Sequence, residues 1–446
     1  MRSYYQLSRR TFLKVASVAA GLGSVSSLAG CGDGGQPHKN AGLLTQTPGS
    51  GSPRGLPASI VPEGLGVNVQ FSATDTQAIV MKLADAGFRF ARLDMLWSLV
   101  EQAHGQYDFS IYEPIVSALA ARGIRPLFIL DYNNPLYDNT HSLPLTEVGP
   151  QTDQTRQAFA RFAAVAAAHF KTDGVIWEIW NEPDNPRFWY PKPDPDSYMA
   201  LAKTAIEAIR QADPHATIVG PALVGLEPKY QDAWNFLQRC FVLGLPALLD
   251  AISVHPYRLE PPESATSDYL RLRTLISRYA PPEKATMPVI CSEWGYSLTW
   301  VSEQQQAQYF ARLYLINLLN NLPLTIWYNW HDGPDPKQIE DNFGLVTYTD
   351  QPKMAYFAAQ TLTRELANFS FSERISLPSN ADYALLFTNG PARKQVVWTT
   401  DNPHTIILPA SGTSITITNM TGEKRILSVM NGQLTLEITG SPQYVG

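Results

Sequence analysis

Eight short apolar runs, separated by longer stretches of helical periodicity, constrain the fold of this chain of 446 residues more than any other feature. The apolar runs are GLGVNVQF, FRFARLDMLW, RPLFILDY, VIWEIWNE, TIVGPALV, LDAISVHPY, MPVICSEWGY and LTIWYNWHD. The helix-like segments lie near residues 75–87, 111–122, 152–170, 195–212, 229–243, 265–280, 303–321 and 353–367. Near-continuous apolar strands indicate a parallel sheet that helices cover on both faces. The repeats therefore predict a (β/α)8 barrel, the TIM-barrel fold, over residues 60–367.

The last part of the chain has a different pattern of apolar residues. From about Asn368 onwards, short β-branched or alternating runs are separated by Gly, Asn and Pro. This pattern predicts a small antiparallel, sandwich-like β-domain over residues 368–446, which we expect to support the barrel. The domain contains one tryptophan, Trp398, so an accessory carbohydrate-binding role is the lesser alternative.

The N-terminus reads as an export and anchoring signal. The stretch SRRTFLK is a twin-arginine signature, and the sequence LAGC that ends at Cys31 resembles a bacterial lipobox. We expect residues 1–30 to be a signal peptide and residues 31–59 to be a flexible linker behind a lipidated Cys31. The protein would then sit at the bacterial cell envelope, on a periplasmic or outer surface, through its lipid. The alternative is an ordinary signal peptide with a chance cysteine.

Composition narrows the classes of partner. The net charge of -6 argues against nucleic acid as a ligand. The two other cysteines, Cys240 and Cys291, have no CxxC neighbour, so we expect buried free thiols rather than a metal site, with a disulfide as the alternative. We expect a monomer that needs no metal and no cofactor.

Two glutamates stand where a barrel carries its chemistry. The fourth apolar run ends in Asn181-Glu182 and the seventh contains Glu293 close to its end. Functional residues of such barrels lie at the carboxyl ends of the strands. Two carboxyl groups that face one pocket suit glycoside hydrolysis, in which one is protonated and the other ionised. The tryptophans around Glu182 predict that this carboxyl group lies in an aromatic cleft.

These motifs also carry a family resemblance. WEIWNEP, followed by HPY and later by SEWGY, resembles clan A of the retaining glycoside hydrolases, with families 5 and 39 as the nearest relatives, over about residues 60–365. The resemblance implies that Glu182 is the general acid/base and Glu293 the nucleophile, and that Asn181 binds the sugar 2-hydroxyl. The segment ILDYNNPLY offers Asn133 and its neighbours where family 5 often has a histidine, which is closer to family 39.

Three further polar positions follow from the resemblance. Arg92 resembles the clan arginine beside the nucleophile, and the alternative is an internal ion pair with Glu178. Tyr257 is expected to donate a hydrogen bond to Glu293, and His255 to line the sugar site.

Aromatic residues complete the predicted site. Trp330 is expected to form an apolar floor under the sugar, although a core position is the alternative. Trp97 and Trp294 are further candidates for substrate binding, as are Trp189, Tyr296 and Trp300, and for each of them core packing is an equal alternative.

An acidic stretch, residues 333–342, follows the eighth apolar run. We interpret GPDPKQIEDN as a solvated loop, with a calcium site as the lesser alternative. The chain as a whole is expected to be a retaining hydrolase of a β-linked polysaccharide or oligosaccharide. The alternatives are a catalytically silent carbohydrate-binding lipoprotein and a transglycosylase that uses the same residues.

Overall fold

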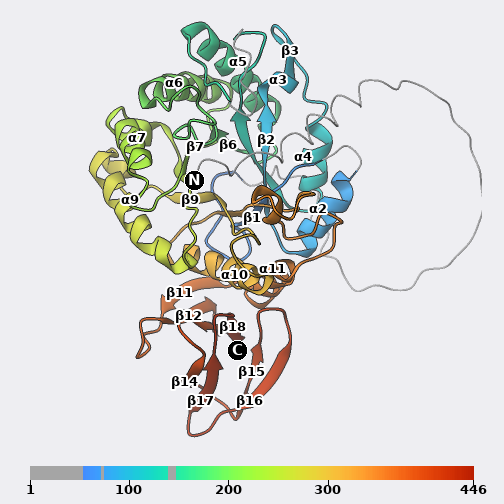
Figure 1. Cartoon of the computed structure of the whole chain (residues 1–446), viewed down its shortest axis with the longest axis vertical. Helices are drawn as coiled ribbons and strands as arrows, with labels where there is room; N and C mark the ends of the chain where they lie inside the picture. The colour runs from blue at the N-terminus through green and yellow to red at the C-terminus, as the bar shows by residue number, and fades with distance from the viewer. Residues whose placement is uncertain (1–53, 72–74, 139–146) are drawn as a thin grey trace, which may run out of the picture.

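The computed structural model describes residues 54–71, 75–138 and 147–446, and its eight parallel strands close the predicted barrel. The barrel strands are β1 (Leu65–Asn68), β2 (Phe90–Leu96), β5 (Arg125–Asp131), β6 (Ile176–Ile179), β7 (Thr217–Val224), β8 (Ala251–His255), β9 (Val289–Trp294) and β10 (Thr325–Trp327). The main helices around them are α2 (Thr76–Asp85), α4 (Glu113–Ala120), α5 (Asp153–His169), α6 (Pro195–Ala212), α7 (Gln231–Val242), α9 (Ala265–Tyr279), α10 (Glu303–Leu319) and α11 (Met354–Glu365) (Figure 1).

Several short elements lie between the main ones. They are α3 (Trp97–Val100), the β3–β4 hairpin (Glu101–Ala103 and Gln106–Tyr107), α8 (Leu245–Leu248), η1 (Pro262–Ser264), η2 (Pro282–Lys284) and η3 (Glu340–Asn342). The η3 turn lies inside the acidic loop that follows β10.

The barrel interior is built in layers that follow from strand alternation. An apolar layer near the start of the strands contains Phe90, Leu127, Ile176, Val219, Ala251, Ile290, Leu324 and Ile326. Side chains two residues further along a strand point to the same side. A polar layer therefore follows directly above, made of Asn68, Arg92, Glu178, Ser253 and Ser292. The apolar layer closes the bottom of the barrel, and the polar layer forms the base of the functional site.

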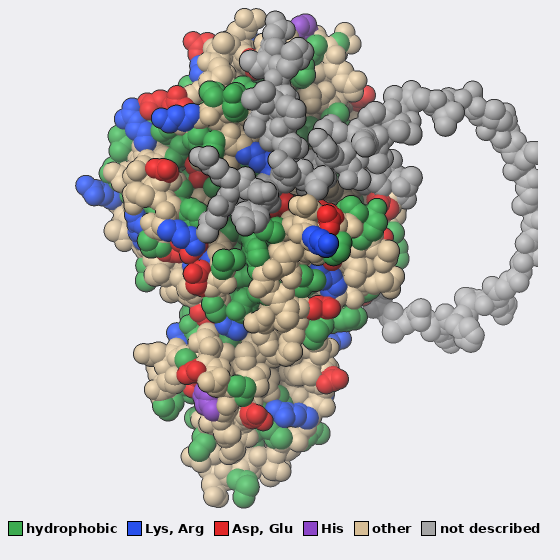
Figure 2. Space-filling model, viewed as in Figure 1, with side chains coloured by type: hydrophobic (Ala, Val, Ile, Leu, Met, Phe, Trp, Pro, Cys, Tyr) green, Lys and Arg blue, Asp and Glu red, His purple; other side chains and the backbone are tan. Residues whose placement is uncertain are grey.

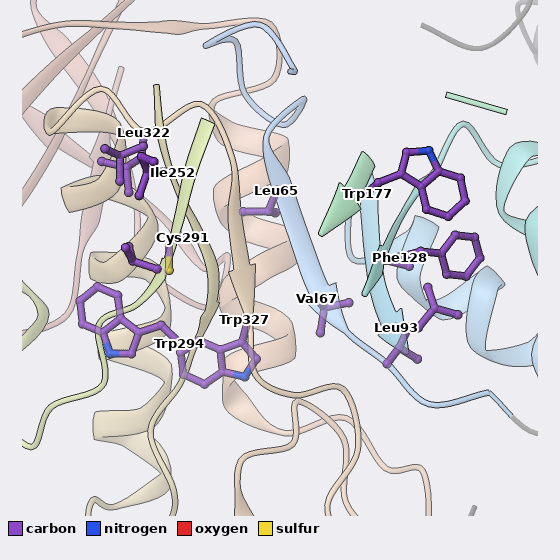
Figure 3. Packing of buried hydrophobic residues seen from close by; sticks show 14 of the residues in the cluster. Leu65, Val67, Leu93, Phe128, Trp177, Ile252, Cys291, Trp294, Leu322 and Trp327 are labelled. Carbon is purple, nitrogen blue, oxygen red and sulfur yellow. The ribbon is translucent and has the colours of Figure 1, made fainter. Parts of the chain in front are cut away.

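The intervening strand residues point outward, under the helices. Leu93, Phe128 and Trp177 belong to three neighbouring strands, and Figure 3 shows their side chains on the helix side. The rings of Phe128 and Trp177 are stacked with their centroids 5.8 Å apart. This outer layer holds most of the apolar core of the described residues.

The barrel begins earlier than the predicted boundary at residue 60. Arg54 forms an ion pair of 3.0 Å with Asp213, and the Gly55 N–H donates to Thr217 at 3.1 Å. Leu56 packs against the apolar layer at the bottom of the barrel. Residues 54–56, within the segment predicted as linker, therefore make specific contacts with the barrel, and the Leu56 side chain covers the bottom of its interior. The predicted signal peptide and Cys31 lie outside the described residues.

The C-terminal β-domain is also present. Its strands are β11 (Ser370–Arg374), β12 (Asp382–Asn389), β13 (Ala392–Thr399), β14 (His404–Pro409), β15 (Ser414–Thr418), β16 (Lys424–Ser428), β17 (Gln433–Ile438) and β18 (Gln443–Val445). They form an antiparallel six-stranded sheet and a two-stranded ribbon, which share a small apolar core. The domain lies below α10 and α11 in Figure 1.

A buried carboxylate joins this domain to the barrel. Glu263 in η1 accepts hydrogen bonds from Nε and Nη2 of the Arg312 guanidinium, at 2.7 Å each, and from the Trp398 Nε1–H at 2.7 Å. Trp398 is therefore an interior residue of the junction, and its ring cannot stack on a sugar at the surface. This contact favours the supporting role of the domain.

Cys240 and Cys291 are both buried and free. None of the helices in the described ranges is long and apolar enough to cross a membrane. On the face shown in Figure 2, acidic and basic side chains are interspersed over the described surface.

We predict that Glu263→Ala destabilises the protein by about 3–5 kcal/mol, because it leaves the buried Arg312 without its carboxylate. Thermal unfolding of the purified protein measures this loss. Asp196→Ala is the matched control, since it breaks a bidentate pair with Arg239 that lies at the surface. The control is expected to change stability little. Equal losses for both variants would contradict the assigned role of Glu263.

Candidate active site

Arg92 organises the polar layer at the base of the site. Its Nε donates to Glu178 Oε2 at 2.8 Å, and its Nη1 donates to Glu293 Oε2 at 2.6 Å and to Asn68 Oδ1 at 3.0 Å. Its Nη2 donates to Asn181 Oδ1 at 2.8 Å. The two alternatives for Arg92 are therefore realised together, because one guanidinium pairs with the structural Glu178 and with Glu293.

Arg92 and Glu178 are both buried, so the neighbouring charges decide whether each group stays ionised. Burial alone would lower the pKa of Arg92, but the Glu178 and Glu293 carboxylates raise that pKa above its ordinary value. Burial likewise opposes ionisation of Glu178, but the neighbouring Arg92 and His255 outweigh it, so the pKa of Glu178 is lowered. Both groups of the inner pair are thus held in their charged forms.

Glu182 reaches the site through a strained turn. Strand β6 ends at Ile179, and the next residues include Trp180 and Glu182 at positive φ angles of 66° and 48°. Such angles are uncommon for residues other than glycine and call for local support. The Trp180 Nε1–H donates to the Phe188 carbonyl at 2.8 Å, and the Asn185 N–H donates to the Glu182 carbonyl at 3.0 Å. The turn thus rotates Trp180 out of the site and Glu182 into it.

Glu293 reaches the site through an irregularity in strand β9. Its neighbour β10 pairs Thr325 with Cys291 but Trp327 with Trp294, so β9 has one extra residue between the two pairs. A bulge of this kind re-aims a side chain. It allows Ser292 and Glu293, which are adjacent in sequence, both to face the interior: Ser292 contacts His255, and Glu293 contacts Arg92.

The two glutamates are close together and differently partnered. Glu293 accepts from Arg92 and, on Oε1, from the Tyr257 hydroxyl at 2.9 Å. Glu182 contacts His255 Nδ1 through Oε1 at 2.9 Å, and its Oε2 accepts from the Asn185 amide at 3.0 Å. One oxygen of each glutamate and a His255 nitrogen all lie within 4.8 Å of one another.

This same trio is the group of described residues whose atoms could reach a metal ion. Its atoms are already engaged with protein partners, since Arg92 donates to Glu293 and His255 contacts Glu182. A guanidinium at 2.6 Å from one carboxylate is an unfavourable neighbour for a cation. We therefore interpret the trio as a hydrogen-bonded pair of carboxyl groups.

A pocket with about 530 Å³ of empty space, including its opening to solvent, lies above the polar layer. Among the predicted residues, Arg92, Asn181, Glu182 and Glu293 line it. Tyr257 and His255 act from behind, through their contacts with the two glutamates. Asn133 has no described contact with the pocket.

The predicted tryptophans do not line the pocket. The bulge in β9 turns Trp294 to the outer layer, where Figure 3 shows it close to Trp327. Trp330 lies three residues beyond the end of β10, is 1 % exposed, and packs its ring 6.0 Å from that of Tyr356. Trp97 stacks on Tyr137 with centroids 5.1 Å apart, and its Nε1–H donates to Glu101. The tryptophans expected in an aromatic cleft form a core behind a mainly polar pocket, whose aromatic lining comes from Phe188 and Tyr328.

Several residues that line the pocket were not predicted from the sequence. They are Gln70, Asp94, Arg187, Phe188, Tyr328 and Glu340. Asp94 could have been found, since it lies two residues after Arg92 on the same side of β2. Glu340 could not, because it comes from the acidic loop that we expected to be solvated. That expectation is wrong: Glu340, Asp341 and Asn342 are all buried in η3.

Comparison with known proteins gives the family. The model of the cellulase family, glycosyl hydrolase family 5, matches residues 58–333. The chain belongs to this family. The fold, the family match and the solved relatives below place it in clan A of the glycoside hydrolases, and the family implies a carbohydrate substrate.

Solved structures of other families in the clan resemble the chain closely. A family 39 glycoside hydrolase from the gut symbiont Bacteroides cellulosilyticus WH2 is 26% identical, with a TM-score of 0.74, over 86% of this chain and 80% of that one. A family 39 β-xylosidase from Caulobacter crescentus shares the fold, with a TM-score of 0.64 and 16% identity, over 88% of this chain and 97% of that one.

A curated relative is the β-xylosidase of Geobacillus stearothermophilus, which is 25% identical over 240 residues. That match covers 46% of this chain and 45% of the relative, so it spans less than half of either protein.

We predict that Arg92→Leu destabilises the protein by about 3–5 kcal/mol, because Glu178 is then buried without a cation. Urea denaturation at pH 7 measures the effect. The double variant Arg92→Leu/Glu178→Leu is expected to regain part of the loss, since it removes the stranded charge as well. Losses that simply add in the double variant would show that the pair is not energetically coupled.

Proposed function

We propose that this family member hydrolyses β-glycosidic bonds with retention of configuration, with Glu293 as nucleophile and Glu182 as general acid/base. The observation that carries the proposal is the approach of the two carboxyl groups, whose nearest oxygens lie within 4.8 Å. Retaining glycosidases hold their carboxyl groups roughly 5–5.5 Å apart, whereas inverting enzymes need roughly 6.5–9.5 Å to admit a water molecule.

The partners of each glutamate support this division of roles. Arg92 and Tyr257 both donate to Glu293, which suits a carboxylate that must be ionised to attack the anomeric carbon. In the first step a Glu293 oxygen bonds to that carbon while Glu182 transfers its proton to the leaving oxygen. In the second step Glu182 takes a proton from water, whose oxygen displaces Glu293 and releases the sugar.

Asn181 is placed to hold the sugar during both steps. Its Oδ1 accepts from Arg92, so the orientation of its amide is fixed and its NH2 group remains for the substrate. We assign that group to the 2-hydroxyl of the sugar next to the cleaved bond. A hydrogen bond at this position strengthens in the transition state of such reactions.

The first substrates to test are β-xylosides and xylo-oligosaccharides. Two of the similar proteins described above are β-xylosidases by name, one from Geobacillus stearothermophilus and one from Caulobacter crescentus. The polar character of the pocket suits a sugar with free hydroxyls.

We predict that Glu293→Gln abolishes turnover, and that Glu182→Gln lowers kcat/KM for xylobiose by about 10²–10⁴-fold. The Glu182 variant should retain far more of its kcat/KM for 2,4-dinitrophenyl β-xyloside, because this leaving group needs no proton. Proton NMR of the first product should show the β-anomer. Release of the α-anomer, or a Glu182 defect that is equal for both substrates, would overturn the assignment.

We also propose that the protein is exported by the twin-arginine route and anchored at the cell envelope by a lipid on Cys31. The motif SRRTFLK and the lipobox-like LAGC support this proposal. Labelling of cells with radioactive palmitate should mark the full-length protein and not the Cys31→Ser variant, which is expected to move to the soluble fraction. Equal labelling of both would refute the anchor.

A further inference from the structure

A third carboxyl group faces the pocket beside the two glutamates of the proposed mechanism. Glu340 belongs to η3 and lines the pocket, although it is only 7 % exposed. The Tyr328 hydroxyl donates to Glu340 Oε2 at 3.2 Å. The proposed double displacement needs two carboxyl groups, so Glu340 has no part in its chemistry.

The loop that carries Glu340 is held by its own hydrogen bonds. Asp341 Oδ2 accepts from the Asp335 N–H at 2.9 Å, and the Asn342 amide donates to the Gln338 carbonyl at 2.6 Å. The Ser297 hydroxyl donates to the Ile339 carbonyl at 2.8 Å, which ties the loop to the segment after β9. Glu340 is therefore presented to the pocket by a defined backbone.

The surroundings of Glu340 favour its neutral form. The charged and titratable groups around it are Glu293, Glu182, Arg187 and Tyr328. Burial, reinforced by the Glu293 charge, raises the pKa of Glu340 to about 8, against the opposing effect of Arg187. At pH 7 most of the population therefore carries a proton on this side chain.

A protonated carboxyl group has one hydrogen to donate. Tyr328 already supplies the hydrogen in its bond to Glu340, so the proton of Glu340 itself is available to another acceptor. Buried donors are almost always satisfied, and a carboxylic acid kept neutral in an enzyme site can serve as a hydrogen-bond donor. In this pocket the acceptor that arrives with the substrate is a sugar hydroxyl.

We propose that Glu340 is a substrate-binding and specificity-determining residue, whose carboxylic acid donates a hydrogen bond to a hydroxyl of the sugar held between Glu182 and Glu293. The inference rests on the proposed glycosidase function. A site built around a buried hydroxyl partner discriminates strongly against an analogue that lacks this hydroxyl. It also adds a second carboxyl group, after Glu182, that must carry a proton, so binding weakens when Glu340 ionises.

The test follows kcat/KM for 2,4-dinitrophenyl β-xyloside, or for the corresponding β-glucoside if only that sugar is hydrolysed, between pH 6 and pH 9.5. This leaving group removes the need for the Glu182 proton, so the alkaline limb reports on Glu340. The parent should lose about tenfold by pH 9, where roughly a tenth of a group with a pKa of about 8 is protonated. Glu340→Gln should be less active at pH 6 but should show no such limb, because an amide donates without titrating.

A second arm identifies the hydroxyl. Glu340→Ala should lower kcat/KM for the parent sugar about ten- to a hundredfold. It should have little further effect on the one aryl glycoside, 3-deoxy or 4-deoxy, that lacks the partner hydroxyl. Glu373→Gln on the exposed face of β11 is the control and should keep the parent profile. Thermal unfolding of each variant confirms that it is folded.

The outcomes separate the two proposals. Turnover by the parent with no alkaline limb, with the same limb in Glu340→Gln, or with an equal Glu340→Ala loss on every deoxy sugar overturns the Glu340 inference and leaves the glycosidase function intact. Absence of turnover of any activated β-glycoside by the folded parent overturns the proposed function, and the inference falls with it.

Discussion

The Arg92 guanidinium is the interaction on which the site depends. It lies between a carboxylate below, Glu178, and a carboxylate above, Glu293, and contacts both within 2.8 Å. Without this cation, Glu178 and Glu293 would face each other in the barrel interior together with Glu182 and Glu340. Buried like charges repel strongly and would shift toward their neutral forms. One positive charge thus allows the same small volume to contain both ionised and protonated carboxyl groups.

A rigid support is needed for such a balance, and the barrel supplies it from below. The apolar layer fills the start of the strands, and Leu56 covers it at the open end. Water that entered from this side would screen the pair formed by Arg92 and Glu178 and weaken it. The segment at residues 54–56 therefore contributes to the site although it lies at the opposite end of the strands.

The periodicity of the sequence predicted all eight barrel strands and the helices between them, because burial on both faces leaves a strong pattern. The rule that functional residues lie at the carboxyl ends of barrel strands pointed to Glu182 and Glu293, and the family resemblance added Asn181 and Arg92, although Arg92 lies in the first half of β2. The tryptophans were expected to line the pocket, and a local feature of the backbone explains why Trp294 does not. A single extra residue in β9 reverses the side on which Trp294 points, and hydrophobicity does not reveal a bulge. The sequence did not indicate that Glu340 lies in the pocket, because the burial of an acidic loop depends on contacts distant in sequence.

The hydrogen bonds around His255 and Asn185 hold the carboxyl group of Glu182 in place. Arg92 has only donors to offer, and its Nη2 lies 3.4 Å from His255 Nε2. His255 Nε2 also lies 3.1 Å from the Ser292 hydroxyl oxygen, and its Nδ1 lies 2.9 Å from Glu182 Oε1. Glu182 is therefore held at both carboxyl oxygens, since Oε2 accepts from the Asn185 amide at 3.0 Å. The contacts from Arg92 through His255, together with the Asn185 amide, thus fix the orientation of the Glu182 carboxyl group at the pocket.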